Sequence, residues 1–255
     1  MTMRNAIITG GTQGIGLAIA VELSKQGMSV AVGARRGDDK EVAHSVSQKI
    51  SGPCFVGQLD VSDQQSIDSF IEKSRQFQGE PDILINAAGI TVHQPIEGHS
   101  DQDWQSVLDI NLSGPFRMMR ACLPGMKSRK WGRIINIAST AARVGVMTHP
   151  AYCASKAGLV GLTRAVAQEG APHGVTCMSV SPSWCETDML HKSTQRMALR
   201  SGDSIENVHS SISASNPQNR IIQPEEIASI VAYCCSDAAR GLTMEDIQIN
   251  AGSLW

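Results

Sequence analysis

The sequence predicts an α/β fold, a doubly wound parallel sheet of about seven strands with helices on both faces. Two observations predict it. Seven short runs rich in β-branched residues occur along the 255 residues, and several are apolar nearly throughout, as strands covered on both faces should be. Longer helical patterns lie between these runs, and strand–helix alternation over a whole chain is typical of a parallel sheet.

The elements follow one another without internal repeats or Pro/Gly-rich linkers, so residues 1–255 are expected to form a single domain. Helical patterns are clearest in GIGLAIAVELSKQG and QSIDSFIEKSRQF. Residues 184–222 carry many polar residues and no clear strand, and an irregular insertion of that length predicts a substrate lid. The expected strands are NAIIT (5–9), SVAVGA (29–34), CFVGQL (54–59), DILIN (82–86), RIINIAS (133–139), VTCMSVS (175–181) and DIQIN (246–250).

The bulk composition excludes several classes of partner. A formal charge of -2 gives no electrostatic reason to expect nucleic acid or an anionic membrane. No apolar run approaches the roughly 20 residues that span a bilayer, and the start leaves no room for a signal peptide. The seven cysteines lack metal-like or CxxC spacing, which predicts buried reduced thiols, no metal site and a cytoplasmic protein.

The stretch TGGTQGIG (9–16) follows the first strand and begins the first helix. Gly10, Gly14 and Gly16 let the backbone turn tightly and approach a pyrophosphate, whose charge would then lie at a helix N-terminus. Their spacing differs from the usual GxGxxG, and a purely structural turn is the alternative.

The end of the second strand should select the cofactor. A carboxylate there would bind the ribose hydroxyls of NAD, but the position holds Ala34, followed by Arg35 and Arg36. Guanidinium groups would hold a 2′-phosphate, so this end favours NADP(H) over NAD(H). The alternatives are that both arginines merely solvate a loop, and that Asp38 or Asp39 contacts the ribose.

The stretch AYCASKAG (151–158) places Tyr152 and Lys156 four residues apart, on one face of a helix. A cation roughly 4 Å from the phenolate stabilises it by about 4 kcal/mol at an effective dielectric near 20. This corresponds to about three pKa units, which would bring the phenol near neutrality and suit it to proton transfer. An ordinary tyrosine beside a surface lysine is the alternative.

Two further polar residues belong to this constellation. Ser139 ends a predicted strand, and ligands of doubly wound sheets bind outside the carboxyl ends of the strands. Its hydroxyl could therefore bond a substrate oxygen. Asn111 lies inside a helical run although Asn is a weak helix former, which indicates a local bend or an ordered water.

Several motifs along the chain occur in the order and spacing found in one known enzyme family. They are TGGTQGIG at 9–16, LDV around Asp60, NAAG at 86–89, Asn111, Ser139, YCASK at 152–156 and SPSWCETDM at 181–189. On these residues the chain resembles the short-chain dehydrogenases/reductases over essentially its whole length. The resemblance implies a Rossmann fold and an enzyme that interconverts a ketone and a secondary alcohol. The alternatives are an NAD-dependent dehydrogenase of a hydroxy acid, sugar alcohol or steroid, and a non-catalytic relative that only binds the dinucleotide.

The resemblance also implies roles for individual residues. Tyr152 would be the general acid/base, and Ser139 would polarise the carbonyl. Lys156 would lower the tyrosine pKa and hold the nicotinamide ribose, and Asn111 would support a water in the proton relay. The cofactor-binding residues would be Gly10, Thr12, Gln13, Gly14, Ile15, Gly16, Arg35, Arg36, Asp60, Val61, Asn86, Ala88, Gly89, Tyr152, Lys156, Pro182, Cys185 and Thr187.

Some positions depart from the family pattern. Ser183 follows Pro182 where relatives usually have glycine, and Cys185 replaces Ile or Val, which puts the nicotinamide pose in doubt. Residues 213–239 look like the corresponding part of 3-oxoacyl and polyketide ketoreductases, and residues 174–184 look more like 3-hydroxybutyrate dehydrogenases. A small 3-oxoacyl or 3-hydroxyacyl substrate is therefore expected. Arg143 and His149 could reach an anionic substrate, although a plain surface role is the simpler interpretation.

Two surface features complete the expectations. The lid contains the basic residues His191, Lys192, Arg196 and Arg200. They are expected to form a solvated helix face rather than a phosphate site. The resemblance implies a homotetramer, with a dimer as the alternative, in which the helices at 113–130 and 151–170 pair. The apolar residues offered for that pairing are Phe116, Met119, Cys122, Leu159, Leu162 and Val166.

Overall fold

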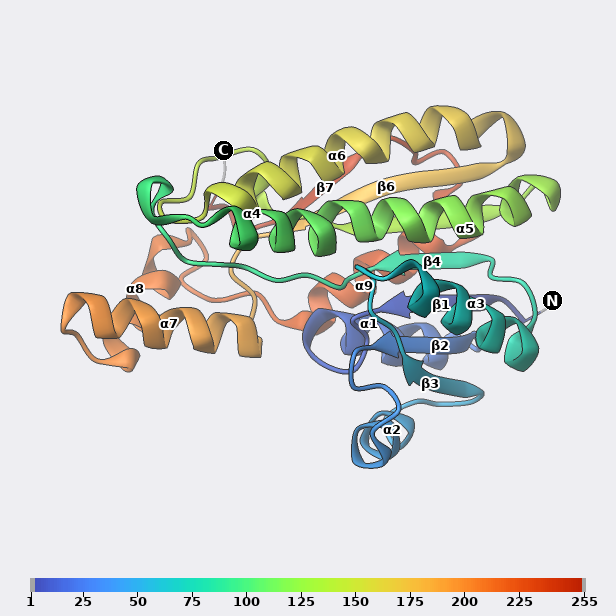
Figure 1. Cartoon of the computed structure of the whole chain (residues 1–255), viewed down its shortest axis with the longest axis horizontal. Helices are drawn as coiled ribbons and strands as arrows, with labels where there is room; N and C mark the ends of the chain where they lie inside the picture. The colour runs from blue at the N-terminus through green and yellow to red at the C-terminus, as the bar shows by residue number, and fades with distance from the viewer. Residues whose placement is uncertain (1–2, 254–255) are drawn as a thin grey trace.

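In the computed structural model, which describes residues 3–253, seven parallel strands form one sheet with helices on both faces (Figure 1). The strand order β3-β2-β1-β4-β5-β6-β7 is the doubly wound arrangement that the sequence predicts. All seven expected strands are confirmed to within two residues at either end. They are β1 Asn5–Thr9, β2 Ser29–Ala34, β3 Cys54–Gln58, β4 Ile83–Asn86, β5 Gly132–Ile137, β6 Val175–Pro182 and β7 Asp246–Ile249.

Alternation along the strands divides the core into two layers. On β1, Ala6 and Ile8 pack with α1 (Gly14–Lys25) and α9 (Pro224–Cys235), whereas Ile7 packs with α3 (Gln64–Gln78) and α5 (Gly114–Ser128) on the opposite face. Both layers are apolar, which explains the almost continuous hydrophobic strands. The main helices are α1 Gly14–Lys25, α2 Lys40–Ser47, α3 Gln64–Gln78, α4 Asp101–Leu108, α5 Gly114–Ser128, α6 Pro150–Gly170, α7 Asp188–Ser201, α8 Ile205–Ser215 and α9 Pro224–Cys235.

The carboxyl ends of the central strands are fixed by polar side chains. Thr9 pairs in register with Asn86, which in turn pairs with Asn136. The Thr9 hydroxyl accepts hydrogen bonds from the backbone N–H groups of Ala87 and Ala88, both at 3.1 Å. Asn86 Nδ2 donates to Asn136 Oδ1 at 2.8 Å. The chain leaving β4 is therefore held against the end of β1.

The expectation of an irregular segment at 184–222 is wrong in its local structure, because the segment contains α7 and α8. These helices project beyond the carboxyl ends of the strands, at the left of Figure 1. Packing between α7 and α8 stabilises both helices, because their apolar residues form a small hydrophobic cluster separate from the sheet. Trp184 packs against this cluster. Its members are Leu190, Ala198, Val208, Ile212 and Ile221.

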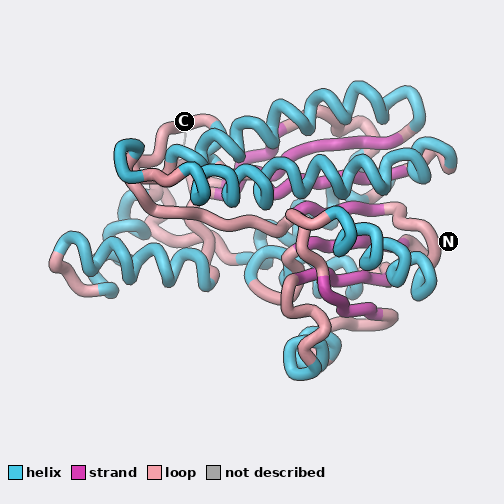
Figure 2. Tube along the Cα trace, viewed as in Figure 1, coloured by secondary structure: helices cyan, strands magenta, loops and turns pink. Residues whose placement is uncertain are grey.

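The long helices α5 and α6 lie side by side on one face of the sheet, with α4 continuing into α5 as one helical rod (Figure 2). Of the residues expected to form an intersubunit surface, Phe116 is 45% exposed. Leu162 is half-buried. The other four pack into the protein's own core, because the sheet below these helices requires a wide apolar stripe. They are Met119, Cys122, Leu159 and Val166.

Among the described residues, no helix is both long enough and apolar enough to cross a membrane.

Candidate active site

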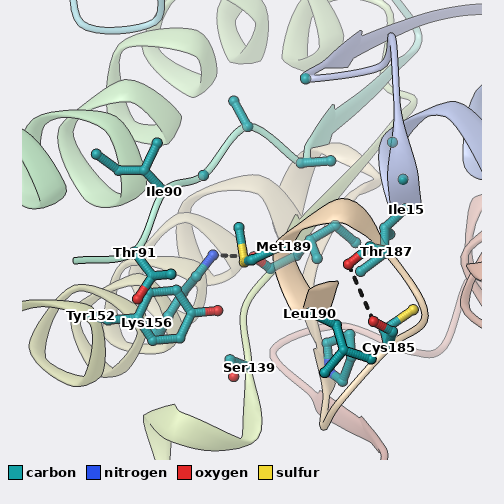
Figure 3. Close-up of a pocket in the computed structure, with 18 of the residues that line it drawn as sticks. Ile15, Ile90, Thr91, Ser139, Tyr152, Lys156, Cys185, Thr187, Met189 and Leu190 are labelled. Atoms are coloured by element: carbon teal, nitrogen blue, oxygen red, sulfur yellow. Dashed lines mark hydrogen bonds between the residues drawn. The ribbon is translucent and has the colours of Figure 1, made fainter. Parts of the chain in front are cut away.

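A cavity of about 670 Å³ lies at the carboxyl ends of the strands, between the sheet and α7 (Figure 3). Every residue expected at the site lines it except Asn86 and Asn111, which lie buried beneath it. The sequence therefore identified the residues of one continuous cavity, although they are distributed from residue 10 to residue 187.

The glycine-rich turn forms one end of this cavity. Gly10 has φ +65°, and a Cβ there would lie 2.8 Å from the Cα of Ala88. A Cβ on Gly16 would lie 2.5 Å from the carbonyl oxygen of Gly10. Only glycine fits either position, and the turn leads directly into the N-terminus of α1. Thr12, Gln13 and Ile15 also line this end, which fits a pyrophosphate.

The end of β2 presents arginine rather than carboxylate to the cavity. Arg35 and Arg36 line it and are exposed, whereas Asp38 and Asp39 do not line it. Asp38 Oδ1 accepts a hydrogen bond from Gln58 N at 2.8 Å. Asp39 caps α2 and forms a 2.6 Å ion pair with Arg36. Because Arg36 is already paired with Asp39, Arg35 is the better placed of the two to hold a 2′-phosphate.

Asp60 and Val61 line the same end of the cavity as Arg35 and Arg36. The Asp60 carboxylate accepts hydrogen bonds from the Ser62 backbone at 2.9 Å and from the Ser62 hydroxyl at 2.6 Å. Burial acts to raise the pKa of Asp60, but these bonds and the charge of Arg35 lower it overall. Asp60 is thus an oriented carboxylate.

Asn111 lies in a π-helical turn, Asp109–Ser113, between α4 and α5. The sequence position predicted a local bend or an ordered water, and the structure has a local change of helix type at this residue. Its side chain is fully buried. The amide oxygen Oδ1 accepts a hydrogen bond from the backbone N–H of Ile90, and Nδ2 donates one to the carbonyl oxygen of Ile90, both at 2.9 Å. Nδ2 also donates to the Ser155 hydroxyl at 3.1 Å. Asn111 therefore fixes the cavity wall after Gly89 to α6.

Tyr152 and Ser139 lie on the same side of the cavity, and Figure 3 shows the phenol hydroxyl directed into the space beside Ser139. The Ser139 hydroxyl also accepts a hydrogen bond from Ala141 N at 3.1 Å, which fixes its orientation. Burial raises the pKa of the Tyr152 phenol, against the lowering effect of the Ser139 hydroxyl. The two oxygens can therefore address one carbonyl together.

Lys156 is 5% exposed and donates to the carbonyl oxygen of Ile137 at 2.7 Å. Its ammonium lies 5.6 Å from the centre of the Tyr152 ring. Burial lowers the pKa of Lys156 to about 8. The structure therefore differs from the expectation that Lys156 lowers the pKa of the phenol. The phenol pKa is raised, because burial dominates and the ammonium is directed toward the backbone of β5.

The segment after β6 covers the opposite side of the cavity. Pro182, Cys185 and Thr187 line it, and Thr187 lies beside the glycine turn, since a Cβ on Gly14 would be 3.4 Å from its methyl group. Burial raises the pKa of the Cys185 thiol to about 12, so this sulfur remains protonated. The Ser183 hydroxyl also lines the cavity and is buried without a hydrogen-bond partner among the described residues. It is available to a bound molecule.

Several lining residues escaped the sequence reasoning. Asn216 is 1% exposed, and within residues 3–253 its Oδ1 has no hydrogen-bond partner. It reaches the cavity through the packing of α8, which no local pattern reveals. The apolar residues of the substrate end likewise depend on the placement of α7 and of the loop before α6. The additional lining residues include Ile90, Thr91, Val144, Val146, Trp184, Met189, Leu190, Ser193 and Ser215.

The two residues considered for an anionic substrate lie in different places. Arg143 turns away from the cavity and pairs with Asp246 at 2.9 Å. His149 lines the cavity, and its ring centre lies 6.3 Å from that of Tyr152. Only His149 is therefore positioned to meet a substrate. No cluster of His, Cys, Asp and Glu that could hold a metal ion occurs within residues 3–253.

Comparison with known proteins identifies this arrangement. The family model described as short chain dehydrogenase matches residues 4–198. The chain belongs to the short-chain dehydrogenase family. This confirms the family that the sequence motifs indicated.

Individual short-chain dehydrogenases match along nearly the whole chain. An acetoacetyl-CoA reductase of Cupriavidus necator is 37% identical, over 99% of this chain and 98% of the relative. A 3-oxoacyl-(acyl-carrier-protein) reductase of Pseudomonas aeruginosa is 35% identical, over 97% and 96%. The crystal structure of an actinorhodin polyketide ketoreductase variant with NADPH superposes with a TM-score of 0.93 at 32% identity, over 98% and 97%.

Proposed function

We propose that this short-chain dehydrogenase is an NADP(H)-dependent oxidoreductase that interconverts a 3-oxoacyl and a 3-hydroxyacyl compound. The observation that carries the proposal is the convergence of Ser139, Tyr152 and Lys156 on one cavity whose other end is a glycine turn. A proton donor, a carbonyl-binding hydroxyl and a dinucleotide cradle are the parts that carbonyl reduction requires.

The residues fit the cofactor at both ends of the cavity. The space left by Gly10 and Gly16 suits a pyrophosphate, and Arg35 suits a 2′-phosphate. The Ser183 hydroxyl and Thr187 lie where a nicotinamide carboxamide would find hydrogen-bond partners. When bound, NADPH supplies the hydride.

The chain's own residues manage the proton and the substrate oxygen. Ser139 donates a hydrogen bond to the carbonyl oxygen and so polarises it. Tyr152 delivers the proton to that oxygen, and the neutral phenol suits this direction because burial raises its pKa. Lys156, fixed by its hydrogen bond to Ile137, lines the same cavity and would hold the nicotinamide ribose.

The substrate class rests on the cavity wall and on the relatives. Ile90, Val144, Val146, Met189 and Leu190 give the substrate end an apolar wall that suits an acyl chain. The relatives named acetoacetyl-CoA reductase and 3-oxoacyl-(acyl-carrier-protein) reductase bear names of 3-oxoacyl substrates.

Replacing Tyr152 with Phe removes the acid/base hydroxyl alone. We expect NADPH oxidation with an acetoacetyl thioester to slow by about 10²- to 10⁴-fold, the usual contribution of a positioned proton donor. Fluorescence titration of NADPH should show unchanged binding, which serves as the folding control. Wild-type turnover by the variant would disprove the mechanism. Tight NADPH binding by the wild type without reduction of any carbonyl would instead support the non-catalytic alternative.

The proposed assembly is a homotetramer, with a dimer as the alternative. On α5, Phe116 is exposed beside Arg120. On α6, Ala154, Ala157 and Gly161 are exposed small residues that would permit close approach of another helix. Because all seven cysteines are free thiols, a reducing compartment such as the cytoplasm is the proposed location.

A further inference from the structure

A second cavity, of about 480 Å³, opens beside α7 and shares Thr91 with the active-site cavity. Its wall contains two guanidinium groups, Arg196 and Arg200, one helical turn apart on α7. The sequence suggested a solvated helix face here. Both side chains are exposed, as expected of such a face, and they also border the loop that follows β4.

Neither guanidinium has a carboxylate partner within residues 3–253. Arg200 Nη2 donates to the carbonyl oxygen of His93 at 3.2 Å, so this side chain is held in place. Asp103 is the one carboxylate in the described wall, and it is engaged by the Ser100 hydroxyl at 2.8 Å. Two positive charges against one negative charge favour an anionic ligand.

The cavity is also connected to the chemistry. The rings of His93 and His149 have centres 4.0 Å apart and Nε2 atoms 3.2 Å apart, and His149 lines the active-site cavity. Thr91 lines both cavities, and its Oγ1 is buried without a hydrogen-bond partner in the part of the chain that the structure describes. A ligand that reaches from Tyr152 past Thr91 to the arginines would satisfy this hydroxyl.

The histidines do not supply the positive charge at neutral pH. Burial, together with the charges of His149, Arg196 and Arg200, lowers the pKa of His93 to about 4. Burial also lowers the pKa of His149. Recognition of an anion at pH 7 is therefore assigned to the arginines.

We propose that Arg196 and Arg200 bind the phosphate of a phosphopantetheine arm whose thioester end lies at Tyr152. This inference rests on the proposed function and adds a recognition site for the carrier of the acyl group. The rim of this cavity also carries Val92 and the 85% exposed Leu199, apolar side chains that suit the uncharged part of an arm. The arm has two sources, coenzyme A and an acyl-carrier protein.

The test compares acetoacetyl thioesters that differ only in their arm. Pantetheine lacks the phosphate, phosphopantetheine carries it, and coenzyme A and a carrier protein supply it in their own contexts. With NADPH as reductant, we expect Arg196→Ala to lower the kcat/KM ratio of phosphopantetheine to pantetheine thioester by about 10-fold, the loss of one charge-assisted contact. Arg200→Ala should act in the same direction.

The matched control is Lys192→Ala, which removes a positive charge from the exposed face of α7 outside both cavities. It should leave the ratio within about 2-fold of wild type, since long-range charge alone is screened. An equal loss with Lys192→Ala, or an unchanged ratio with Arg196→Ala, would overturn the proposal. A loss with coenzyme A alone or with the carrier protein alone identifies the source, and both results support the site.

Binding separates this proposal from the proposed function. Free coenzyme A, titrated calorimetrically into wild type and Arg196→Ala, should bind the variant about 10-fold more weakly even if no thioester is reduced. Failure of wild type to reduce any thioester would therefore refute the proposed function alone. Equal coenzyme A affinity of the two proteins would refute the phosphate site.

Discussion

Replacing Lys156 with Met is expected to make the folded protein more stable at pH 7 while removing its activity. Lys156 is 5% exposed, and burial lowers its pKa from the usual 10.5 to about 8. At pH 7 the lysine is charged in both folded and unfolded chains, but the folded protein holds that charge away from water. The buried charge therefore opposes folding.

The magnitude follows from this pKa difference. Each pKa unit corresponds to about 1.36 kcal/mol, so the buried charge opposes folding by about 3 kcal/mol at pH 7. Methionine is similarly long and apolar, but it leaves the carbonyl oxygen of Ile137 without its 2.7 Å hydrogen bond, which offsets about 1 kcal/mol. We expect a net gain of about 2 kcal/mol in the free energy of unfolding.

Urea unfolding followed by tryptophan fluorescence, at one protein concentration and without cofactor, measures this gain. The sign of the pH dependence provides the control. Between pH 8 and 10.5 the unfolded chain binds more protons at Lys156 than the folded protein does, so wild-type stability should rise with pH in that window. The Met variant lacks this contribution, and its advantage should shrink as pH rises. A variant less stable than wild type at pH 7, or an advantage independent of pH, would refute the reasoning.

Two further predictions concern the cofactor and the assembly. Arg35→Ala should weaken NADPH binding by about 10-fold without affecting NADH binding, as expected for the loss of one exposed charge-assisted contact. Arg36→Ala should weaken NADPH binding less, because Asp39 already pairs with Arg36. Fluorescence titrations measure both, and equal affinity of wild type for the two cofactors would contradict the assignment. Light scattering at micromolar concentration should show a tetramer that Phe116→Asp converts to smaller species, because the charge would be buried at the interface. A fully active wild-type monomer would count against the assembly.

The sequence predicted those features that depend on local chemistry. Gly10, Tyr152 and Lys156 were identified because a tight turn and helical spacing are visible within a few residues. An irregularity at Asn111 was predicted because an amide interrupts a helical pattern, but its form, a π-helical turn, was not. Even the pairing of Arg36 with Asp39 lies within one short segment, although the sequence left the roles of these two residues open.

Features that depend on distant packing could not be predicted. Lys156 bonds to Ile137 rather than acting on the phenol, because the carbonyl of β5 lies beneath α6. Asn216 and Thr91 enter the cavity walls through the positions of α8 and the loop after β4. The extents of α7 and α8 were not predicted because their apolar residues pack against each other rather than against the sheet.

The π-helical turn at Asp109–Ser113 makes the register of α4 and α5 sensitive to chain length. One residue fewer would let the two helices join as a regular α-helix, so deletion there would improve the backbone locally. It would also rotate everything on one side of the turn by about 100° relative to the other. The Asn111 amide would then leave Ile90, or the apolar stripe of α5 would leave the sheet. A single-residue deletion should therefore be tolerated least at this turn, even though it would restore regular α-helical hydrogen bonding there.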